Sequence, residues 1–193
     1  IAPFASQFST PERAFVYTGT EAAEKGRLIL YNLTRKQKII LTSENLVVKD
    51  YRIYPAGDRI LFSASEWSKY QPGLYEQSLY AVTTGRSSDP AHKPGSIQQI
   101  LGNQDYENLK FDLSPDGRTI AFTTNEDGIS ALHLLDTRTR KESPSPGMPV
   151  GIISDLEWHK NGRELVFSLE STRAPSDAYS YNVTDRKLDR WTY

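Results

Sequence analysis

The chain contains no cysteine, only one methionine and no long hydrophobic run. The absence of cysteine excludes disulfides and thiolate metal sites but does not indicate a compartment, so the bacterial periplasm and the cytoplasm both stay open. No apolar stretch approaches the roughly 18 residues that a membrane-spanning helix needs. The first residues also lack the basic start and long apolar stretch of a signal peptide. We therefore expect a soluble chain without membrane insertion.

The chain also has no large excess of charge of either sign, since 23 of its 193 residues are basic and 24 are acidic. Nothing in this balance would attract nucleic acid, so we expect no nucleic-acid partner. Helical periodicity is scarce as well, and the best helical candidate is Gly19–Arg27, which glycine bounds on both sides. The short apolar runs and the 11 tyrosines favour strands instead.

One phrase recurs through the chain. Each copy has a turn with glycine, one or two polar residues, three apolar residues that end in Phe, and then small hydroxyl residues. A decayed fourth copy lacks the glycine and has Tyr17 in place of Phe. The copies are STPERAFVYTGTE (Ser9–Glu21), YPAGDRILFSASE (Tyr54–Glu66), SPDGRTIAFTTNE (Ser114–Glu126) and HKNGRELVFSLES (His159–Ser171).

A second phrase follows each copy of the first. It is clearest in YNLTRKQK (Tyr31–Lys38) and YNVTDRKL (Tyr181–Leu188), and it is weaker in LYAVTTGR and LLDTRTRK. Two phrases that alternate in the same order four times indicate a repeated structural unit and not a catalytic motif.

Each unit resolves into four strands. In the third unit they are Leu109–Leu113, Thr119–Thr124, Ala131–Asp136 and a poorly marked fourth strand, which is clear in the other units. Four antiparallel strands with a period of about 45 residues are typical of a β-propeller blade. We therefore predict an all-β fold, with a single propeller-type repeat domain over 1–193. It would contain about four four-stranded antiparallel blades, at 4–43, 46–102, 106–145 and 150–193.

The repeat LSPDGRTIAFTTNEDG…LHLLDTRTRK resembles that of TolB-like propellers and of the propeller domains in the prolyl oligopeptidase family of serine peptidases. The stretch from Pro149 onward looks more like the peptidase propellers, whereas the first 110 residues look more like TolB-type proteins. The resemblance implies the fold along nearly the whole chain. It implies little about activity, because propellers carry many unrelated functions.

Two features depart from complete members of these families. No G-x-S-x-G nucleophile motif is present, so we expect this chain to lack the hydrolase domain that would carry peptidase chemistry. Four blades are also fewer than the six to eight that are usual there. We expect a natural fragment, an engineered or recombined protein, or a homodimer in which two arcs close an eight-bladed ring. A compact four-bladed ring is the other alternative.

No residue pattern indicates catalysis, a metal or a cofactor. The three histidines, His92, His133 and His159, do not pair in an H-x-H or H-E-x-x-H motif. We interpret His92 as a loop residue, His133 as a hydrogen-bonded residue on the side of a blade, and His159 as a turn residue. We therefore predict no catalytic residue, no metal ligand and no cofactor in this chain.

Candidate partner-binding residues lie in loops between the second and third strands of the blades. These loops gather at one face of a propeller, where ligands dock. The longest exposes Trp67, Tyr70 and Tyr75, large aromatic residues of the kind that anchor protein contacts; packing against the edge of their own blade is the alternative. Arg173 belongs to the corresponding loop of the fourth blade. Glu126 and Asp127 form a weaker candidate, with plain hairpin solvation as the alternative.

These observations support a non-catalytic propeller module that binds a protein or peptide partner. In a peptidase-like parent, such blades would gate access to the catalytic cavity. In a TolB-like parent, they would present loops to protein partners in a bacterial envelope. A stand-alone propeller hydrolase or lyase, with histidines and carboxylates facing the channel, is the competing hypothesis.

Overall fold

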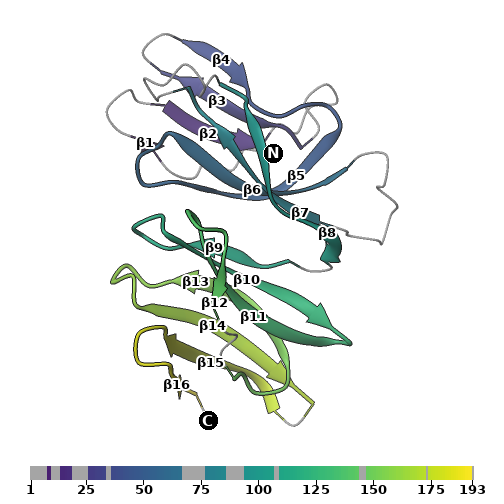
Figure 1. Ribbon diagram of the computed structural model, residues 1–193, viewed down its shortest axis with the longest axis vertical. Helices are drawn as coiled ribbons and strands as arrows, with labels where there is room; N and C mark the ends of the chain where they lie inside the picture. Colours follow the sequence, from purple (N-terminus) through teal and green to yellow (C-terminus); the bar gives the residue numbers. More distant parts are fainter. Residues whose placement is uncertain are drawn as a thin grey trace. The chain divides into compact units, whose positions relative to one another are not determined.

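A computed structural model of the protein describes residues 8–9, 14–18, 26–33, 36–66, 77–85, 94–106, 109–143, 147–172 and 174–192. All regular structure in these ranges is β-strand, with sixteen strands in four sheets of four (Figure 1). The chain divides into two compact units, Ile1–Asp105 and Tyr106–Tyr193. No helix long and apolar enough to cross a membrane occurs in the described ranges.

The first unit holds two sheets in which each strand neighbours the next along the chain, in the orders β1-β2-β3-β4 and β5-β6-β7-β8. The strands of the first sheet are Phe8–Ser9 (β1), Ala14–Thr18 (β2), Leu28–Asn32 (β3) and Gln37–Ile40 (β4). Those of the second are Leu46–Ile53 (β5), Arg59–Glu66 (β6), Gln77–Thr83 (β7) and Ile97–Tyr106 (β8).

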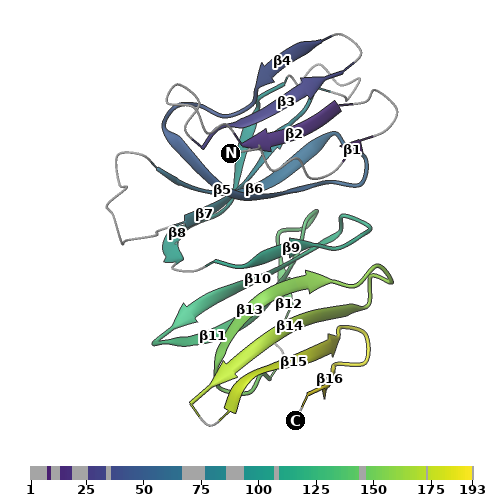
Figure 2. The same ribbon diagram turned by 180° about the vertical axis from the view of Figure 1, so that it is seen from behind.

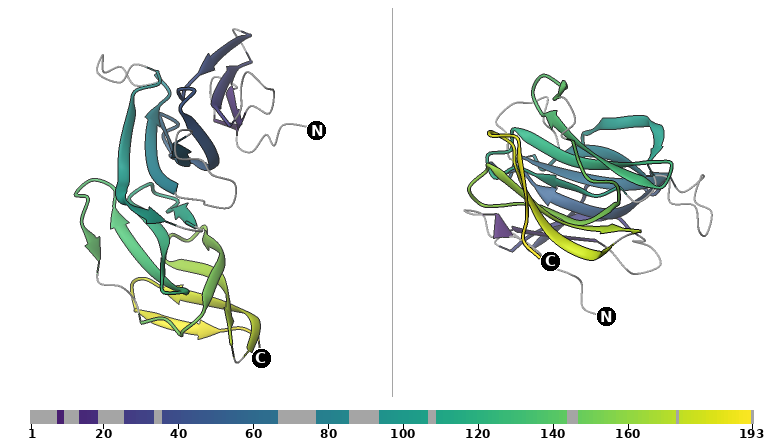
Figure 3. Two further views of the ribbon diagram at one scale, coloured as in Figure 1. Left: turned by 90° about the vertical axis from the view of Figure 1, so that its right-hand side faces the viewer. Right: turned by 90° about the horizontal axis from the view of Figure 1, so that it is seen from below.

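The second unit repeats this arrangement, and its two sheets appear from both sides in Figures 1 and 2. The third sheet consists of Phe111–Leu113 (β9), Thr119–Glu126 (β10), Ile129–Asp136 (β11) and Glu142–Ser143 (β12). The fourth consists of Ile152–Trp158 (β13), Glu164–Ser171 (β14), Ala174–Asn182 (β15) and Lys187–Arg190 (β16). The strands have the twist expected of antiparallel sheets (Figure 3).

In the second, third and fourth sheets, the turn between the first two strands is determined locally. At Ser114–Gly117, the Gly117 N–H donates to the Ser114 carbonyl over 2.8 Å, and Gly117 has a φ of 72°, which favours glycine. The Asp116 carboxylate accepts from the Ser114 hydroxyl at 2.6 Å and from the Arg118 N–H at 3.0 Å. The same backbone bond closes the turns that end at Gly57 and Gly162, at 2.7 Å and 2.9 Å. Short-range chemistry thus explains why the repeated phrase forms the turn before the second strand in these three sheets.

The core of each unit lies between its two sheets. In the first unit, Ile60 and Phe62 of β6 pack with Leu28 and Leu30 of β3. In the second unit, Leu165 and Phe167 of β14 pack with a cluster from both sheets: Ala121, Leu132, Leu134, Ile153, Leu156, Leu169 and Tyr181. In both units, therefore, the closing Phe of the repeated phrase packs against the preceding sheet. A hydrogen bond of 2.6 Å from the Trp158 N–H to the buried Asp112 carboxylate joins the innermost strands of the third and fourth sheets.

The prediction of an all-β fold with four four-stranded antiparallel blades is confirmed. The weak fourth strand expected in the third unit is β12, which has only two residues. Most of the helical candidate Gly19–Arg27 lies outside the described residues.

Candidate binding pocket at the loop end of the second unit

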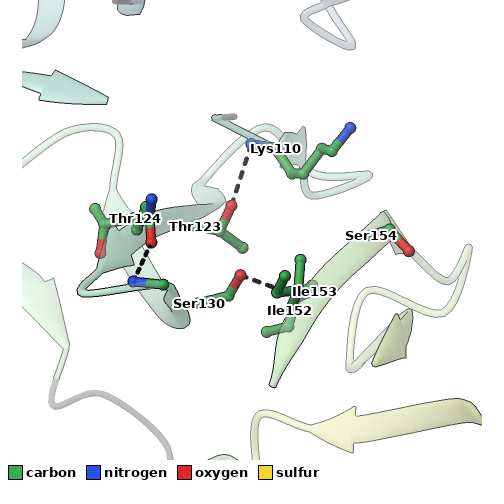
Figure 4. A pocket seen from close by; sticks show the side chains of 9 residues that line it. Lys110, Thr123, Thr124, Ser130, Ile152, Ile153 and Ser154 are labelled. Carbon is green, nitrogen blue, oxygen red and sulfur yellow. Dashed lines mark hydrogen bonds between the residues drawn. The ribbon is translucent and has the colours of Figure 1, made fainter. Parts of the chain in front are cut away.

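A pocket of about 290 Å³ lies between the third and fourth sheets at the end where β10 turns into β11 and where β13 begins (Figure 4). We call this end of the second unit its loop end. The pocket is lined by Lys110, Thr123, Thr124, Asn125, Gly128, Ser130, Ile152, Ile153 and Ser154. Figure 4 shows Thr123 and Ser130 on the side of the third sheet, and Ile152 and Ile153 on the side of the fourth.

The pocket lies beside an unusually short innermost strand. In the second and fourth sheets the first strand has eight and seven residues, and it pairs with the second strand as far as Glu66 and Glu170, respectively. In the third sheet, β9 has three residues, and its register with β10 ends at Phe122. The last residues of β10 continue beyond that point and form one wall of the pocket.

Hydrogen bonds fix both walls. The Ser130 N–H donates to the Gly151 carbonyl at 2.9 Å, and the Ile153 N–H donates to the Ser130 hydroxyl oxygen at 3.0 Å. Ser130 therefore holds the beginning of β13 with both its backbone and its side chain. Gly151 is required there because a Cβ at this position would lie 2.4 Å from the Glu170 carbonyl oxygen. The pocket is consequently a preformed feature of the packing between the two sheets.

The polar side chains of the lining are hydrogen-bonded to the backbone around the pocket. The Thr123 hydroxyl oxygen accepts the Lys110 N–H at 3.2 Å, and the Asn125 side-chain oxygen accepts the Gly128 N–H at 2.9 Å. Because the hydroxyl oxygens of Thr123 and Ser130 accept backbone N–H groups, their O–H groups are left to donate. Lys110 is exposed, and its side chain extends away from Thr123 and Ser130 (Figure 4); no lining residue is acidic.

The structure describes two of the six predicted partner-binding residues. Glu126 and Asp127 are exposed on the tight turn between β10 and β11, where Asp127 has a φ of 52°. They lie between the lining residues Asn125 and Gly128 but do not line the pocket themselves. The other four predicted residues lie outside the described ranges; these are Trp67, Tyr70, Tyr75 and Arg173.

Sequence reasoning missed Lys110, Thr123 and Ser130, which resemble ordinary residues at strand ends. A usable signal was present, because the first strand of the third unit is visibly shorter than LVVKDYRI in the second.

His133 is held in a row of polar groups on the other face of the third sheet. Its Nε2 lies 2.8 Å from the Thr124 hydroxyl oxygen and its Nδ1 lies 3.3 Å from a Glu142 carboxylate oxygen. Its ring stacks on Phe122 with centroids 4.8 Å apart. His159 accepts the Asn161 N–H at 3.3 Å within its turn. No group of three or more His, Asp or Glu residues that could hold a metal ion occurs in the part of the chain that the structure describes.

No protein-family model matches the sequence. The Tol-Pal system protein TolB of Ruthia magnifica subsp. Calyptogena magnifica is 32% identical over 79 residues. That match covers 41% of this chain and 18% of the relative, so the matched stretch spans less than a fifth of that protein's length.

Solved structures extend the likeness to the fold of nearly the whole chain. The crystal structure of TolB from Acinetobacter baumannii matches 93% of this chain and 40% of its own, with a TM-score of 0.69 and 13% identity. The β-propeller domain of the Trilobed protease from Pyrococcus furiosus matches 97% of this chain and 57% of its own, with a TM-score of 0.63 and 18% identity. The predicted resemblance to TolB-like and peptidase-type propellers is confirmed, and the four sheets are blades of a partial β-propeller.

Proposed function

We propose that this chain is a non-catalytic propeller module that binds a protein or peptide partner at the loop end of its blades. The observation that carries the proposal is the pocket between the third and fourth blades, with the hydroxyl groups of Thr123 and Ser130 on one side and Ile153 on the other. Apolar surface next to a few fixed polar groups is the usual composition of a recognition site. The pocket is small for a complete ligand of drug size, and it therefore suits part of a larger partner.

Two contexts for such a module are supported by the comparisons. The sequence relative is a protein of the Tol-Pal system, which favours a protein-interaction module like that of TolB. A propeller domain of a protease shares the fold, which favours a module that controls access to a peptidase domain. In both contexts the loop end would contact the partner chain and the blades would supply a rigid support.

Selection of peptides tests the proposal directly. Random peptides displayed on phage would be selected on the immobilised chain, and the affinities of the selected peptides measured by fluorescence anisotropy. Asn125→Phe, at the strand position paired with Ser130, places a bulky ring at the pocket and should abolish binding. Lys160→Phe, on an exposed turn at the other end of the fourth blade, is the matched control and should leave it unchanged. Peptides that bind equally to both variants, or no selected peptide at all, would refute a peptide site here.

A second candidate, a hydrolase, is favoured by the row of Thr124, His133 and Glu142. A hydroxyl, an imidazole and a carboxylate in sequence are the groups of a nucleophilic triad. The stacking of His133 on Phe122 supports a structural role instead. Turnover of a nitrophenyl ester that disappears in His133→Gln would favour the hydrolase, whereas equal background rates would exclude this row as its catalyst.

We also propose that the open face of the fourth blade binds a second copy of the chain. This face, which lies away from the third blade, carries Val166, Ile152 and Trp191, with exposed fractions of 40%, 58% and 68%. The Trp191 ring nitrogen donates to the Ser180 hydroxyl at 2.8 Å, and Ser180 is paired with Val166, which places all of them on one surface. In each unit a blade face rich in large residues packs on the preceding blade, and a second copy would continue this stacking.

A further inference from the structure

We infer that the open face of the fourth blade binds the first blade of a second copy, in a head-to-tail contact that repeats the joint between the third and fourth blades. This inference rests on the proposal that a second copy covers the open face, and it names the part of that copy and the groups that hold it. The observation that carries it is the position of Glu157, an exposed carboxylate on the open face.

The third blade holds the fourth through Asp112. This residue lies opposite Ala121, which directly precedes the closing Phe122, and Ala121 belongs to the cluster between the two blades. Residues that lie opposite each other in a sheet point to the same face, so Asp112 faces the fourth blade. Its carboxylate accepts the Trp158 N–H at 2.6 Å. A carboxylate of one blade thus holds a backbone N–H on the innermost strand of the next.

Glu157 has the equivalent place in the fourth blade. It lies opposite Val166, which directly precedes the closing Phe167, and Val166 is 40% exposed on the open face. Glu157 therefore points out of the open face, as Asp112 points toward the fourth blade. Asp112 is buried in the joint, whereas Glu157 is exposed. The fourth blade consequently presents the acceptor that would hold the innermost strand of a further blade.

The first blade has a backbone N–H in the matching position. Its innermost strand is β1, an edge strand of its sheet. Phe8 of β1 lies opposite the residue two places before Tyr17, the closing aromatic residue of the first blade. Trp158 has the same register with respect to the closing Phe167. The N–H of Phe8 therefore corresponds to the one that Trp158 donates to the third blade, and it would donate to Glu157 of a second copy.

The outer face of the first blade is the one that does not pack on the second blade. Leu30 packs on the second blade, so its neighbours Ile29 and Tyr31 in β3 point to the outer face. Their partners in β4 are Ile40 and Lys38, which lie on the same face. Ile29 is fully buried within the single chain, whereas Ile40 is 45% exposed and Lys38 is exposed. The edge strand β4 therefore offers a second copy one apolar and one basic side chain.

The outer edges of the two blades match in hydrophobicity and charge. The open face of the fourth blade has Trp191 at its outer edge, 68% exposed, where the first blade has Ile40. The open face also carries Glu157 and Glu170, and Lys38 of the first blade supplies the opposite charge. A contact between two fourth blades would instead bring one acidic face against another, and like charges would repel each other. The first blade is therefore the better partner, and in a dimer the contact forms twice, because a closed head-to-tail pair uses both surfaces of each copy.

Cross-linking between copies tests which blades meet. The chain has no cysteine, so one introduced cysteine gives a unique thiol. Ile40→Cys marks the outer edge of the first blade, and Asp189→Cys marks the outer edge of the open face, because Asp189 lies opposite Ser180. With a short bismaleimide, we expect a mixture of these two variants of the full chain to give cross-linked dimers that contain one copy of each. Each variant alone should give no cross-linked dimer.

Substitution of Glu157 tests the joint itself. Glu157→Gln removes the charge of the acceptor and should raise the dissociation constant of the dimer about tenfold in sedimentation equilibrium. Glu157→Asp introduces the residue type that the third blade uses at Asp112, and it should associate like the parent. Glu126→Gln, on an exposed turn of the third blade, is the matched control and should also associate like the parent.

The outcomes separate this inference from the proposal that a second copy covers the open face. Cross-linking of Asp189→Cys with itself, or a dimer in which the mixed cross-link is absent, would overturn the inference and leave that proposal standing. Association that Glu157→Gln leaves unchanged would overturn the inference as well. A chain that stays monomeric at all concentrations would overturn both.

Discussion

The central strands of the second and fourth blades have the same place in the repeat but different surroundings. In β6, the six residues from Ile60 to Ser65 are all buried, so both faces of that strand are covered. In β14, buried Leu165, Phe167 and Leu169 alternate with accessible Val166, Ser168 and Glu170. Because successive side chains of a strand point to opposite faces, the alternation means that one face of the fourth blade is open. The repeat therefore encodes a sheet with two packing faces, of which the fourth blade uses one.

We expect the largest difference in stability between substitutions at two neighbouring positions of β14. Leu165→Asp places a carboxylate at a fully buried site and should destabilise the second unit by about 3 kcal/mol or more. Val166→Asp, one residue away on the open face, should cost about 1 kcal/mol, mainly through the poor strand propensity of Asp. Urea unfolding followed by tryptophan fluorescence measures both values. Equal losses for the two variants would contradict the assignment of an open face.

The second prediction concerns what covers that face in solution. We expect sedimentation equilibrium to give twice the mass of 21.8 kDa at micromolar concentration. Val166→Asp and Trp191→Asp should return the chain to the monomer without unfolding it, because both positions are exposed in the single chain. Glu164→Asp, on the same strand as Val166, keeps the charge of that side chain and is a control that should remain a dimer. A wild-type monomer at all concentrations would exclude a second copy as the occupant.

The repeat could be predicted because the interactions that start each blade lie within a few residues. The turn Ser114–Gly117 depends on one glycine and one carboxylate, and the following apolar run specifies β10 without distant partners. The pocket depends instead on residues far apart in the sequence, such as Ser130 with Gly151 and Ile153. Only the shortness of the strand LKFDL could have indicated it. Loop aromatics such as Trp67 stay a prediction, since they lie outside the described residues.

We expect a smaller loss of stability when a hydrogen bond between the third and fourth blades is removed at the pocket. Ser130→Ala removes the acceptor of the Ile153 N–H, and leaving this group without a partner should cost about 1–2 kcal/mol. Ser154→Ala, on the same strand as Ile153 and paired with Ser168, should change stability by less than about 0.5 kcal/mol. Native-state hydrogen exchange should show faster exchange at Ile153 in the first variant only. Unchanged protection of that amide would contradict the role given to Ser130.

We expect the smallest effect on the acid dependence of stability, at the equivalent turns of the third and fourth blades. Hydrogen bonding from the Ser114 hydroxyl is the main cause that lowers the pKa of Asp116 below its usual value. Burial opposes this effect, and the Arg118 N–H and its positive charge lower the pKa further. The equivalent residue of the fourth blade is Asn161, whose side-chain oxygen accepts the Arg163 N–H at 2.9 Å without any charge.

A lowered pKa means that the folded state holds the proton less tightly than the unfolded state. The contribution of Asp116 is therefore complete above the unfolded pKa of about 4, and it is lost as the pH falls through the lower folded value. Asp116→Asn should remove this part of the acid dependence, and Asn161→Asp should add a similar one to the fourth blade. The carboxylate is largely exposed, so both changes should be small and should diminish in high salt. Urea midpoints between pH 3 and pH 6 measure them, and an acid dependence that Asp116→Asn leaves unchanged would show that other carboxylates govern the acid stability of this unit.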